Sequence, residues 1–580
     1  MSSCMISPLT SLTSELKAVL QEDTSHHLRC IIGTNITTRY ASSSPVLSDF
    51  RRAAADKNLD KDVTVVDDLR RLVPLTDYES YRPFVAKFLD RPCKMPEVEN
   101  LLAPGLPTFI CVSSSTSSNE PKRFPKYPRT WKTPPVVAAP PESGTVASIF
   151  SLGYKDLLEV LADSGEIALR IPVSPGSVWY WRTYMNWSVE TDATRMTTIV
   201  PNHVVPWAAS LITHHRPFML MHALFALADT RVEQIHTTFI TLFVDLLHRV
   251  QEDWGMLVSS IRDGTIPDIE HIHHVRSHLQ DHMHANPQRA EELQGIGPPL
   301  SCPAWAERVW PNLKVLTCIC SGTFSTAVPK ARTVLGPNVA INSPGYICTE
   351  GLRGTMLNVG DTETFFFDTE DVLEFLDVMD TQTHRNIVQR WEVQPGRLYQ
   401  PVFTSQDGLW RYLIDDVVQI IGFDPRNGSP VFRYCARKNL AIRLYYAMIT
   451  EADLVKVIQA INRQDMMEVH EFTTALDQRE LPATVGLFVE ITGDLGLNAH
   501  LSREKAFEAL VTTNYEHQAQ LNFGGLRLPT IRILKHGTFM EYRQWRGESM
   551  NVGVNQLKVP VVMWDPNALA WLIERVVREV

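Results

Sequence analysis

The sequence contains little glycine: its 580 residues include 28 glycines against 37 prolines. Glycine therefore makes up about 5% of the chain, below the roughly 7% of average proteins. This shortage excludes collagen-like and glycine-rich linker chains, and it makes the residues of any loop that normally depends on glycine informative. Hydrophobic residues make up 44% and charged residues 21%, which is the mixture of an ordinary globular protein. At this length we expect more than one domain.

Positive charge is also scarce. The chain has 55 lysines and arginines and 65 aspartates and glutamates, which gives a net charge of −10. A protein dedicated to nucleic acid needs a cationic surface that neutralises backbone phosphates. The charge balance therefore predicts that nucleic acid is not a partner.

Paired cysteines and long apolar runs are missing as well. The nine cysteines are scattered and include no C-x-x-C pair, which predicts a reducing compartment. The most apolar stretch, residues 217–228, is interrupted by His222 and is too short to span a bilayer. Residues 1–20 lack the basic and apolar regions of a secretory signal. We therefore expect a cytoplasmic protein without a membrane partner, either a monomer or a weak dimer.

Helix and strand patterns alternate from the proline-rich stretch after residue 121 to about residue 425, which predicts an α/β architecture. A strong turn signal, D-P-R-N-G at Asp424–Gly428, separates this part from a smaller α+β unit. We predict a large domain over 1–425 with mixed sheets and helices, a hinge over 426–440 and a smaller domain over 441–580. The expected helices are 9–20, 48–55 (with Ser48 as N-cap), 154–162, 218–228, 233–254 and 451–463, and the expected strands are 108–112, 314–320, 364–367 and 484–491.

The common catalytic motifs are absent. The chain has no G-x-S-x-G, H-E-x-x-H, Walker A or G-x-G-x-x-G sequence. This excludes the simple forms of serine hydrolases, zinc proteases, P-loop enzymes and Rossmann dehydrogenases.

Histidines gather between His271 and His284. Three of them are spaced by four residues, so a helix would place them on one face, as a zinc or copper site requires. The surrounding residues are mostly polar, however, and a solvated surface helix explains the pattern and is the interpretation we favour. Whether this cluster binds a metal stays open. The histidines are His271, His273, His274, His278, His282 and His284.

A run of small hydroxyl residues, Ser113–Ser118, directly follows the expected strand 108–112, and Lys122 comes shortly after. Hydroxyl and backbone N–H groups donate to phosphoryl oxygens, and an ammonium group offsets phosphate charge. Such a loop is able to hold the phosphates of a nucleotide. Taken alone, however, a Ser/Thr run is more often a flexible surface loop.

Three later segments accompany this loop: Tyr346–Gly351 (Y-I-C-T-E-G), Gly408–Val418 (G-L-W-R-Y-L-I-D-D-V-V) and Asn555–Pro560 (N-Q-L-K-V-P). In this order the set resembles the GH3 (Gretchen Hagen 3) family of acyl acid amido synthetases, which conjugate auxin and jasmonate in plants and have microbial relatives. The family's S-S-G-T-S-x-G-x-x-K-x-x-P signature corresponds to residues 113–125. The resemblance covers roughly residues 80–560 and implies the fold of adenylate-forming enzymes, with a mobile C-terminal domain.

The resemblance implies an enzyme that uses ATP and Mg²⁺. An organic acid would be joined to AMP with release of pyrophosphate, and the acyl group would then pass to an amine, expected to be an amino acid, to form an amide. The implied catalytic residues are Lys558, Thr116 and Glu350. Lys558 would stabilise charge on the carboxylate and the α-phosphate, and Glu350 would hold Mg²⁺.

The resemblance also implies a nucleotide site. Tyr346 would pack against adenine, Asp416 would accept hydrogen bonds from the ribose hydroxyls, and Arg437 would contact ribose or phosphate. The implied nucleotide-binding residues are Ser113, Ser114, Ser115, Thr116, Ser117, Lys122, Tyr346, Thr349, Glu350, Asp416, Arg437 and Lys558. For the acid, the aromatic segment 177–181 suggests Trp179 and Trp181 as pocket residues, although a place in the core explains them as well.

Several positions depart from the family pattern. Ser115 and Asn119 replace glycines of the phosphate loop, which let the backbone approach a phosphate closely. Asp415 replaces the glycine of the family's Gly-Asp pair and adds a negative charge. These departures leave open a relative that binds a nucleotide or small acid without ligation. An enzyme whose acceptor is an alcohol or a thiol also stays open, because no residue decides the acceptor. Further departures that remove positive charge are Leu413, Met448 and Val561.

Overall fold

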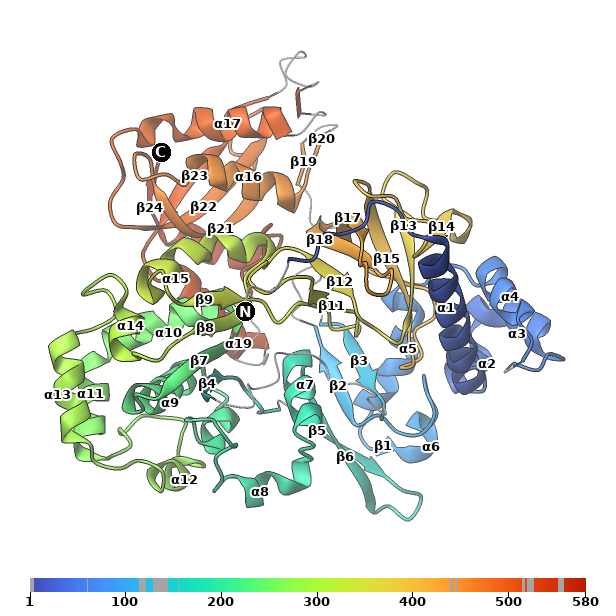
Figure 1. Cartoon of the computed structure of the whole chain (residues 1–580), viewed down its shortest axis with the longest axis horizontal. Helices are drawn as coiled ribbons and strands as arrows, with labels where there is room; N and C mark the ends of the chain where they lie inside the picture. Colours follow the sequence, from blue (N-terminus) through green and yellow to red (C-terminus); the bar gives the residue numbers. More distant parts are fainter. Residues whose placement is uncertain are drawn as a thin grey trace.

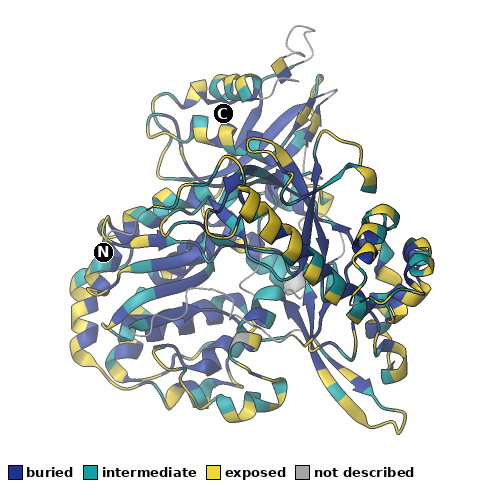
Figure 2. Cartoon of the chain, turned by 45° about the vertical axis from the view of Figure 1, so that its right-hand side comes forward, coloured by how far each residue is buried: buried dark blue, intermediate teal, exposed yellow. Residues whose placement is uncertain are grey.

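The computed structural model describes residues 5–59, 61–113, 121–128, 144–154, 156–438, 442–444, 447–513, 517–518, 526–550 and 558–580. Figure 1 shows a large part built on three sheets, with a smaller C-terminal part above the parallel sheet. Strands are mostly buried, whereas the outward faces of the peripheral helices are exposed (Figure 2). The structure confirms the predicted α/β class. Among the described residues, no helix combines the length and the apolar character needed to cross a membrane.

The first hundred residues are mainly helical and include helices at both predicted places. The Thr13 side chain caps the first helix by accepting a hydrogen bond from Leu16 N, so this helix begins later than predicted and continues to Asn35. The prediction of Ser48 as an N-cap is wrong, because Leu47 occupies that position and Ser48 is already helical. The helices are α1 (Ser14–Asn35), α2 (Arg39–Ser43), α3 (Ser48–Ala54), α4 (Thr64–Leu72), α5 (Arg82–Val85) and α6 (Met95–Val98).

A five-stranded sheet follows, in the order β1-β5-β6-β2-β3. The helix predicted over 154–162 is wrong, because this segment is a strand in which buried Leu158 and Val160 flank exposed Glu159. Pairing with the next strand stabilises the extended form. The strands are β1 (Cys93–Lys94), β2 (Phe109–Val112), β3 (Arg123–Lys126), β5 (Asp156–Leu161) and β6 (Ile167–Pro175), and helix α7 (Gly176–Tyr184) follows β6.

A four-stranded parallel sheet, ordered β4-β7-β8-β9, forms the second layer together with its helices. The predicted helix 233–254 is wrong in its first part, because Val232–Phe239 is a strand and the helix begins at Ile240. The sheet contains β4 (Thr145–Ile149), β7 (Val232–Phe239), β8 (Val315–Ile319) and β9 (Ala340–Asn342). The helices of this region are α8 (Asp192–Arg195), α9 (His215–Ala228), α10 (Ile240–Glu252), α11 (Trp254–Asp263), α12 (Arg276–Gln280), α13 (Pro287–Ile296), α14 (Trp305–Val309) and α15 (Val328–Leu335).

The histidine cluster does not lie on one long helix. Helix α12 has only five residues, so the expected helix through His274, His278 and His282 is wrong. His271 instead stacks on His214 at a ring distance of 3.6 Å, and His282 Nε2 lies 3.1 Å from Thr197 O. In the part of the chain that the structure describes, no three His, Cys, Asp or Glu side chains converge as metal ligands would.

A nine-stranded, mainly antiparallel sheet completes the large part. The predicted turn Asp424–Gly428 is confirmed: Gly428 N donates to Asp424 O at 2.8 Å between two paired strands. Part of the predicted hinge, Pro430–Arg437, is the second of these strands; the domain boundaries themselves stay a prediction. The strands are β10 (Tyr346–Ile347), β11 (Arg353–Met356), β12 (Phe365–Phe367), β13 (Val372–Asp377), β14 (Ile387–Gln389), β15 (Leu398–Thr404), β16 (Tyr412–Leu413), β17 (Asp416–Phe423) and β18 (Pro430–Arg437).

The C-terminal part combines helices with a four-stranded sheet in the order β21-β22-β23-β24. The predicted helix and strand in this part are confirmed at 451–461 and 484–492, and Thr450 and Asp453 form a capping box at the helix start. The elements are β19 (Ile442–Leu444), β20 (Ala447–Ile449), α16 (Glu451–Ile461), β21 (Glu468–Asp477), β22 (Thr484–Thr492), α17 (Ser502–Thr513), β23 (Thr530–Leu534), α19 (Thr538–Met550), α20 (Pro566–Ile573) and β24 (Val576–Glu579).

Candidate active site

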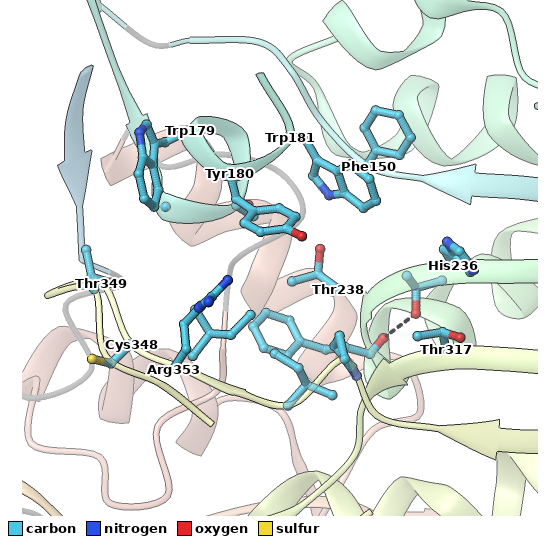
Figure 3. A pocket seen from close by; sticks show the side chains of 18 of the residues that line it. Phe150, Trp179, Tyr180, Trp181, His236, Thr238, Thr317, Cys348, Thr349 and Arg353 are labelled. Carbon is cyan, nitrogen blue, oxygen red and sulfur yellow. Dashed lines mark hydrogen bonds between the residues drawn. The ribbon is translucent and has the colours of Figure 1, made fainter. Parts of the chain in front are cut away.

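A cavity of about 210 Å³ lies where the carboxyl ends of β4, β7 and β8 meet. Ile149, Phe239 and Ile319, at the last positions of these three strands, line it. Helix α7 contributes a second wall, and the loops at 347–351 and 368–370 contribute a third (Figure 3). The carboxyl edge of a parallel sheet is the usual ligand position in α/β proteins.

Aromatic side chains form the wall on α7. Trp181 stacks on Phe150 with a ring distance of 4.8 Å, and Tyr180 meets Trp181 edge-on at 5.6 Å. Trp179 lies farther along the same wall, with Lys126 Nζ 5.5 Å from its ring centre. The structure thus places both predicted tryptophans at the cavity, where the stacked rings offer flat apolar surfaces. Their role in binding an acid stays a prediction.

Asp416 is the centre of a buried polar cluster beside the cavity. Its side chain is 4% exposed and accepts hydrogen bonds from Tyr346 OH at 2.5 Å and from Arg437 Nε at 2.8 Å. Arg437 faces Asp416 because the two residues are directly paired across β17 and β18. Burial and the negative charge of Asp416 raise the pKa of Tyr346 well above its ordinary value, so its hydroxyl keeps the proton that it donates.

Lys558 reaches the same cavity from the C-terminal part. Its Nζ lies 4.7 Å from the ring centre of Phe239 and 5.2 Å from that of Phe324. Burial, with a further contribution from the positive charge of Arg437, lowers the pKa of Lys558 to about 8. No described carboxylate forms an ion pair with this ammonium group. An anion in the cavity would therefore be a favourable partner for it.

Strand β21 holds the segment that carries Lys558. Thr473 Oγ1 donates to Pro560 O at 2.5 Å, and Thr474 N donates to Val561 O at 2.8 Å. Met563 N in turn donates to Thr474 O at 2.7 Å. These bonds fix the backbone directly after Lys558 against the sheet of the C-terminal part.

The loop with Thr349 and Glu350 is anchored by a buried lysine that sequence reasoning missed. Lys126, only 1% exposed, donates from Nζ to Glu350 O at 2.7 Å and lies 3.4 Å from Asp407 Oδ2. Gly351 has a φ of 120°, and a Cβ there would lie 3.2 Å from Lys126 Nζ. A glycine is therefore needed for this close approach. The sequence offers no motif for Lys126, because its partners are more than two hundred residues away.

Only the two ends of the predicted phosphate loop are described, where β2 ends and β3 begins. Ser113 and Lys122 close its base: Ser113 N donates to Lys122 O at 2.8 Å, and Lys122 N donates to Ser113 Oγ at 2.9 Å. Lys122 Nζ lies 3.7 Å from Asp415 Oδ2. Ser114, Ser115, Thr116, Ser117 and Asn119 lie outside the described residues. Because Lys122 and Asp415 lie this close together, the negative charge of Asp415 acts directly on the predicted phosphate-binding lysine.

Three models of one protein family match the chain along its length. The GH3 family N-terminal domain matches residues 55–339, the central domain residues 364–437 and the C-terminal domain residues 452–567. The chain belongs to the GH3 family. The resemblance found in the sequence motifs is thus confirmed.

Curated relatives of this GH3 protein are named amido synthetases. It is 26% identical over 523 residues to the probable indole-3-acetic acid-amido synthetase GH3.1 of Oryza sativa subsp. japonica, covering 86% of this chain and 82% of the relative. It is 27% identical over 357 residues to the jasmonoyl-L-amino acid synthetase GH3.5 of the same plant, covering 57% and 60%. These names agree with the prediction of an enzyme of the ligase class.

Solved structures of the family share the fold. The GH3.15 acyl acid amido synthetase superposes with a TM-score of 0.76 at 18% identity, over 99% of this chain and 98% of that one. A structure of AtGH3.15 acyl acid amido synthetase in complex with 2,4-DB gives a TM-score of 0.74 over 98% and 96%. At this identity the likeness establishes the fold.

Proposed function

We propose that this GH3 protein conjugates an organic carboxylic acid with an amino acid in an ATP-dependent reaction, with an acyl-AMP intermediate. The observation that carries the proposal is the meeting of Lys558 and Arg437 in one aromatic-walled cavity, although the two residues lie more than a hundred positions apart. Lys558 and Arg437 are two cations that suit the phosphates of a nucleotide. Asp416, which pairs with Arg437, is a carboxylate that suits the ribose hydroxyls. The names of the family relatives support the acid–amine coupling.

In the first proposed step, a carboxylate oxygen of the acid attacks the α-phosphorus of ATP, and the bond to pyrophosphate breaks. Lys558 would stabilise the negative charge that gathers on both reactants. Arg437 would contact ribose or phosphate, and Asp416 would exchange its present partners for ribose hydroxyls. Aromatic packing of Tyr346 against adenine completes the proposed nucleotide site.

The donors proposed for Mg²⁺ and phosphates suit these groups chemically. Glu350, which lies between the lining residues Thr349 and Gly351, offers a hard carboxylate oxygen for the metal, and the metal would offset phosphate charge when bound. Ser113 and Lys122 stand at the base of the hairpin whose hydroxyl residues, Ser114, Ser115, Thr116 and Ser117, we propose as phosphate donors; Thr349 belongs to the same proposed site. Among them we propose Thr116 as a catalytic residue whose hydroxyl would donate to the ATP phosphates during attack by the carboxylate.

In the second proposed step, the amine nitrogen attacks the acyl carbon, the carbon–oxygen bond to AMP breaks, and the amine loses a proton. The C-terminal domain, residues 441–580, would first have to withdraw Lys558 by turning about the predicted hinge. Because β18 is paired as far as Arg437, we place the pivot after that residue. Catalysis would depend on holding and orienting the adenylate without a covalent enzyme intermediate.

ATP–pyrophosphate exchange across a panel of aromatic and aliphatic acids tests the first step, and mass spectrometry of products formed with each amino acid tests the second. Acid-dependent exchange together with an amide product supports the proposal. Acid-dependent exchange without any amide product, together with an ester or thioester formed when an alcohol or thiol is supplied, would contradict the amine acceptor. ATP binding without exchange for any acid would favour the non-catalytic alternative.

We expect Asp415→Asn to lower the KM for ATP by about twofold to fivefold, because it frees Lys122 from a partly exposed ion pair. The side chains are 23% and 30% exposed, so solvent screens the pair and limits the effect. The measurement is the ATP dependence of exchange at low salt. The exposed Asp380→Asn is the matched control and should change nothing. An unchanged or higher KM in Asp415→Asn would show that the pair does not restrain Lys122.

A further inference from the structure

We propose that the inner end of the cavity is a subsite for a hydroxyl or amino group carried by the acid substrate on the side opposite its carboxylate. The proposal rests on the proposed function, because it assumes that the cavity binds the acid. It assigns His236 and Thr317 as the residues that determine specificity there. It also narrows the substrate class to aromatic monocarboxylic acids with a hydrogen-bond donor at the far end.

A polar row crosses the parallel sheet at this end of the cavity. Ser148 on β4 is in register with His236 on β7, His236 with Thr317 on β8, and Thr317 with Asn342 on β9. Side chains in register on parallel strands point to the same face of the sheet. The positions around this row in the same strands are mainly buried apolar residues of the core. Four polar residues in line across such a sheet therefore need hydrogen-bond partners.

The polar row is poorly satisfied by the protein itself. Ser148 Oγ and Asn342 Oδ1 are buried and, among the described residues, have no hydrogen-bond partner. The side chain of Thr317, which is 5% exposed, also makes no hydrogen bond to a described residue. Buried polar groups are almost always hydrogen-bonded in native proteins. Of the four residues, His236 and Thr317 line the cavity, so a ligand there can supply the partner that the Thr317 hydroxyl lacks.

His236 offers an acceptor in particular. Its Nε2 lies 3.1 Å from Gln234 Oε1, so Nε2–H donates and Nδ1 is left as the acceptor. Burial lowers the pKa of His236 to about 4, and the ring is therefore neutral at physiological pH. A neutral acceptor favours a hydroxyl or amino group and gives no charge compensation to a second carboxylate. Dicarboxylic acids are thus disfavoured at this end.

The position of the row matches the far end of a ring-bearing acid. Figure 3 shows His236 and Thr317 at one end of the cavity and Trp179 and Thr349 at the other. Along β7, His236 lies three residues before Phe239, which corresponds to about 10 Å of strand. Phe239 in turn contacts Lys558. In Figure 3 the stacked pair of Phe150 and Trp181 lies between these two ends, where it offers a flat surface to an aromatic ring.

The test compares matched acids: 4-hydroxyphenylacetic with phenylacetic acid, and 3-(4-hydroxyphenyl)propionic with 3-phenylpropionic acid. In the unaltered protein we expect kcat/KM for exchange to favour the hydroxylated member by about tenfold or more, because a site built to hydrogen-bond a hydroxyl rejects the analogue without it. His236→Phe should remove or reverse this preference while leaving the KM for ATP unchanged. Thr317→Val, which keeps the shape of the side chain, should reduce the preference for the hydroxylated acid. His274→Phe, at an exposed position, is the control and should leave this preference unchanged.

Equal kcat/KM values within each pair, or a full preference retained in His236→Phe, would overturn the subsite. If no acid supports exchange, the proposed ligase fails, and the subsite is then judged by equilibrium binding of the same acid pairs to the full chain by calorimetry. Tighter binding of the hydroxylated acids that is lost in His236→Phe would still support the subsite, and equal or absent binding would overturn it.

Discussion

Lys558→Ala is expected to reduce acid-dependent ATP–pyrophosphate exchange by about 10²–10³, the usual cost of removing one group that stabilises developing charge in a water-poor site. The ammonium group is held over Phe239 and Phe324 and has no carboxylate partner among the described residues. Its interaction energy is therefore available to the reacting carboxylate and phosphate. Binding of ATP should weaken much less than turnover, because the proposed role is in the transition state.

Lys535→Ala is the matched control, since this lysine is exposed in the same C-terminal part and should tolerate the change without loss of exchange. Retention of more than about a tenth of the activity in Lys558→Ala would contradict the proposed role. Melting curves of both variants report whether either change unfolds the protein.

Lys558→Arg adds a test by pH. Because burial lowers the pKa of Lys558 to about 8, its positive charge is present below that pH and is lost as the pH rises above it. We expect kcat/KM to fall above pH 8, and kcat to fall at higher pH, because bound phosphates favour the charged form. An arginine stays charged, so any activity left in Lys558→Arg should lack this fall. A fall at the same pH in both proteins would assign it to another group.

Arg543→Ala is expected to lower the free energy of unfolding by about 3–5 kcal/mol, as is typical when one member of a buried ion pair is removed. Arg543 on α19 donates to both carboxylate oxygens of Asp245 on α10, from Nε at 2.7 Å and from Nη2 at 2.6 Å. Its Nη1 also donates to Glu471 on β21 at 2.6 Å and 2.9 Å. Arg543 thus joins the parallel-sheet region to the C-terminal part, and its loss leaves Asp245, 1% exposed, without its cation.

Urea denaturation followed by tryptophan fluorescence measures the loss from the shift in midpoint. Arg463→Ala is the control, because its ion pair with Asp465, at 3.0 Å, has 56% and 41% exposed side chains and should contribute less than about 1 kcal/mol. A triple replacement, Asp245→Leu with Arg543→Met and Glu471→Gln, should recover much of the stability, since it leaves neither carboxylate buried without its cation. Equal midpoints for Arg543→Ala and Arg463→Ala would show that the buried network contributes little.

The residues proposed for the site sit in short continuous motifs, among them Tyr346, Asp416 and Lys558. The structure places Lys558 at the same cavity as Arg437, and the roles of these residues stay predictions. The local sequence predicted less reliably whether a segment forms a helix or a strand. The segment Val232–Phe239 runs into helix α10 without a turn residue, so its apolar pattern was assigned to one long helix. Pairing with β4 and β8, which no local window contains, makes it a strand.

The α/β class and the family could be predicted from the sequence, which also supplied the residues of the proposed nucleotide site, including the loop in which serine and asparagine replace glycines. These features depend on composition and on contiguous motifs. The tertiary structure alone decided that Lys122 faces Asp415, that Lys126 supports the Glu350 loop, and that His236 is in register with Thr317. The physical reason is that ion pairing, burial and strand register join residues far apart in the chain, and no single segment encodes them.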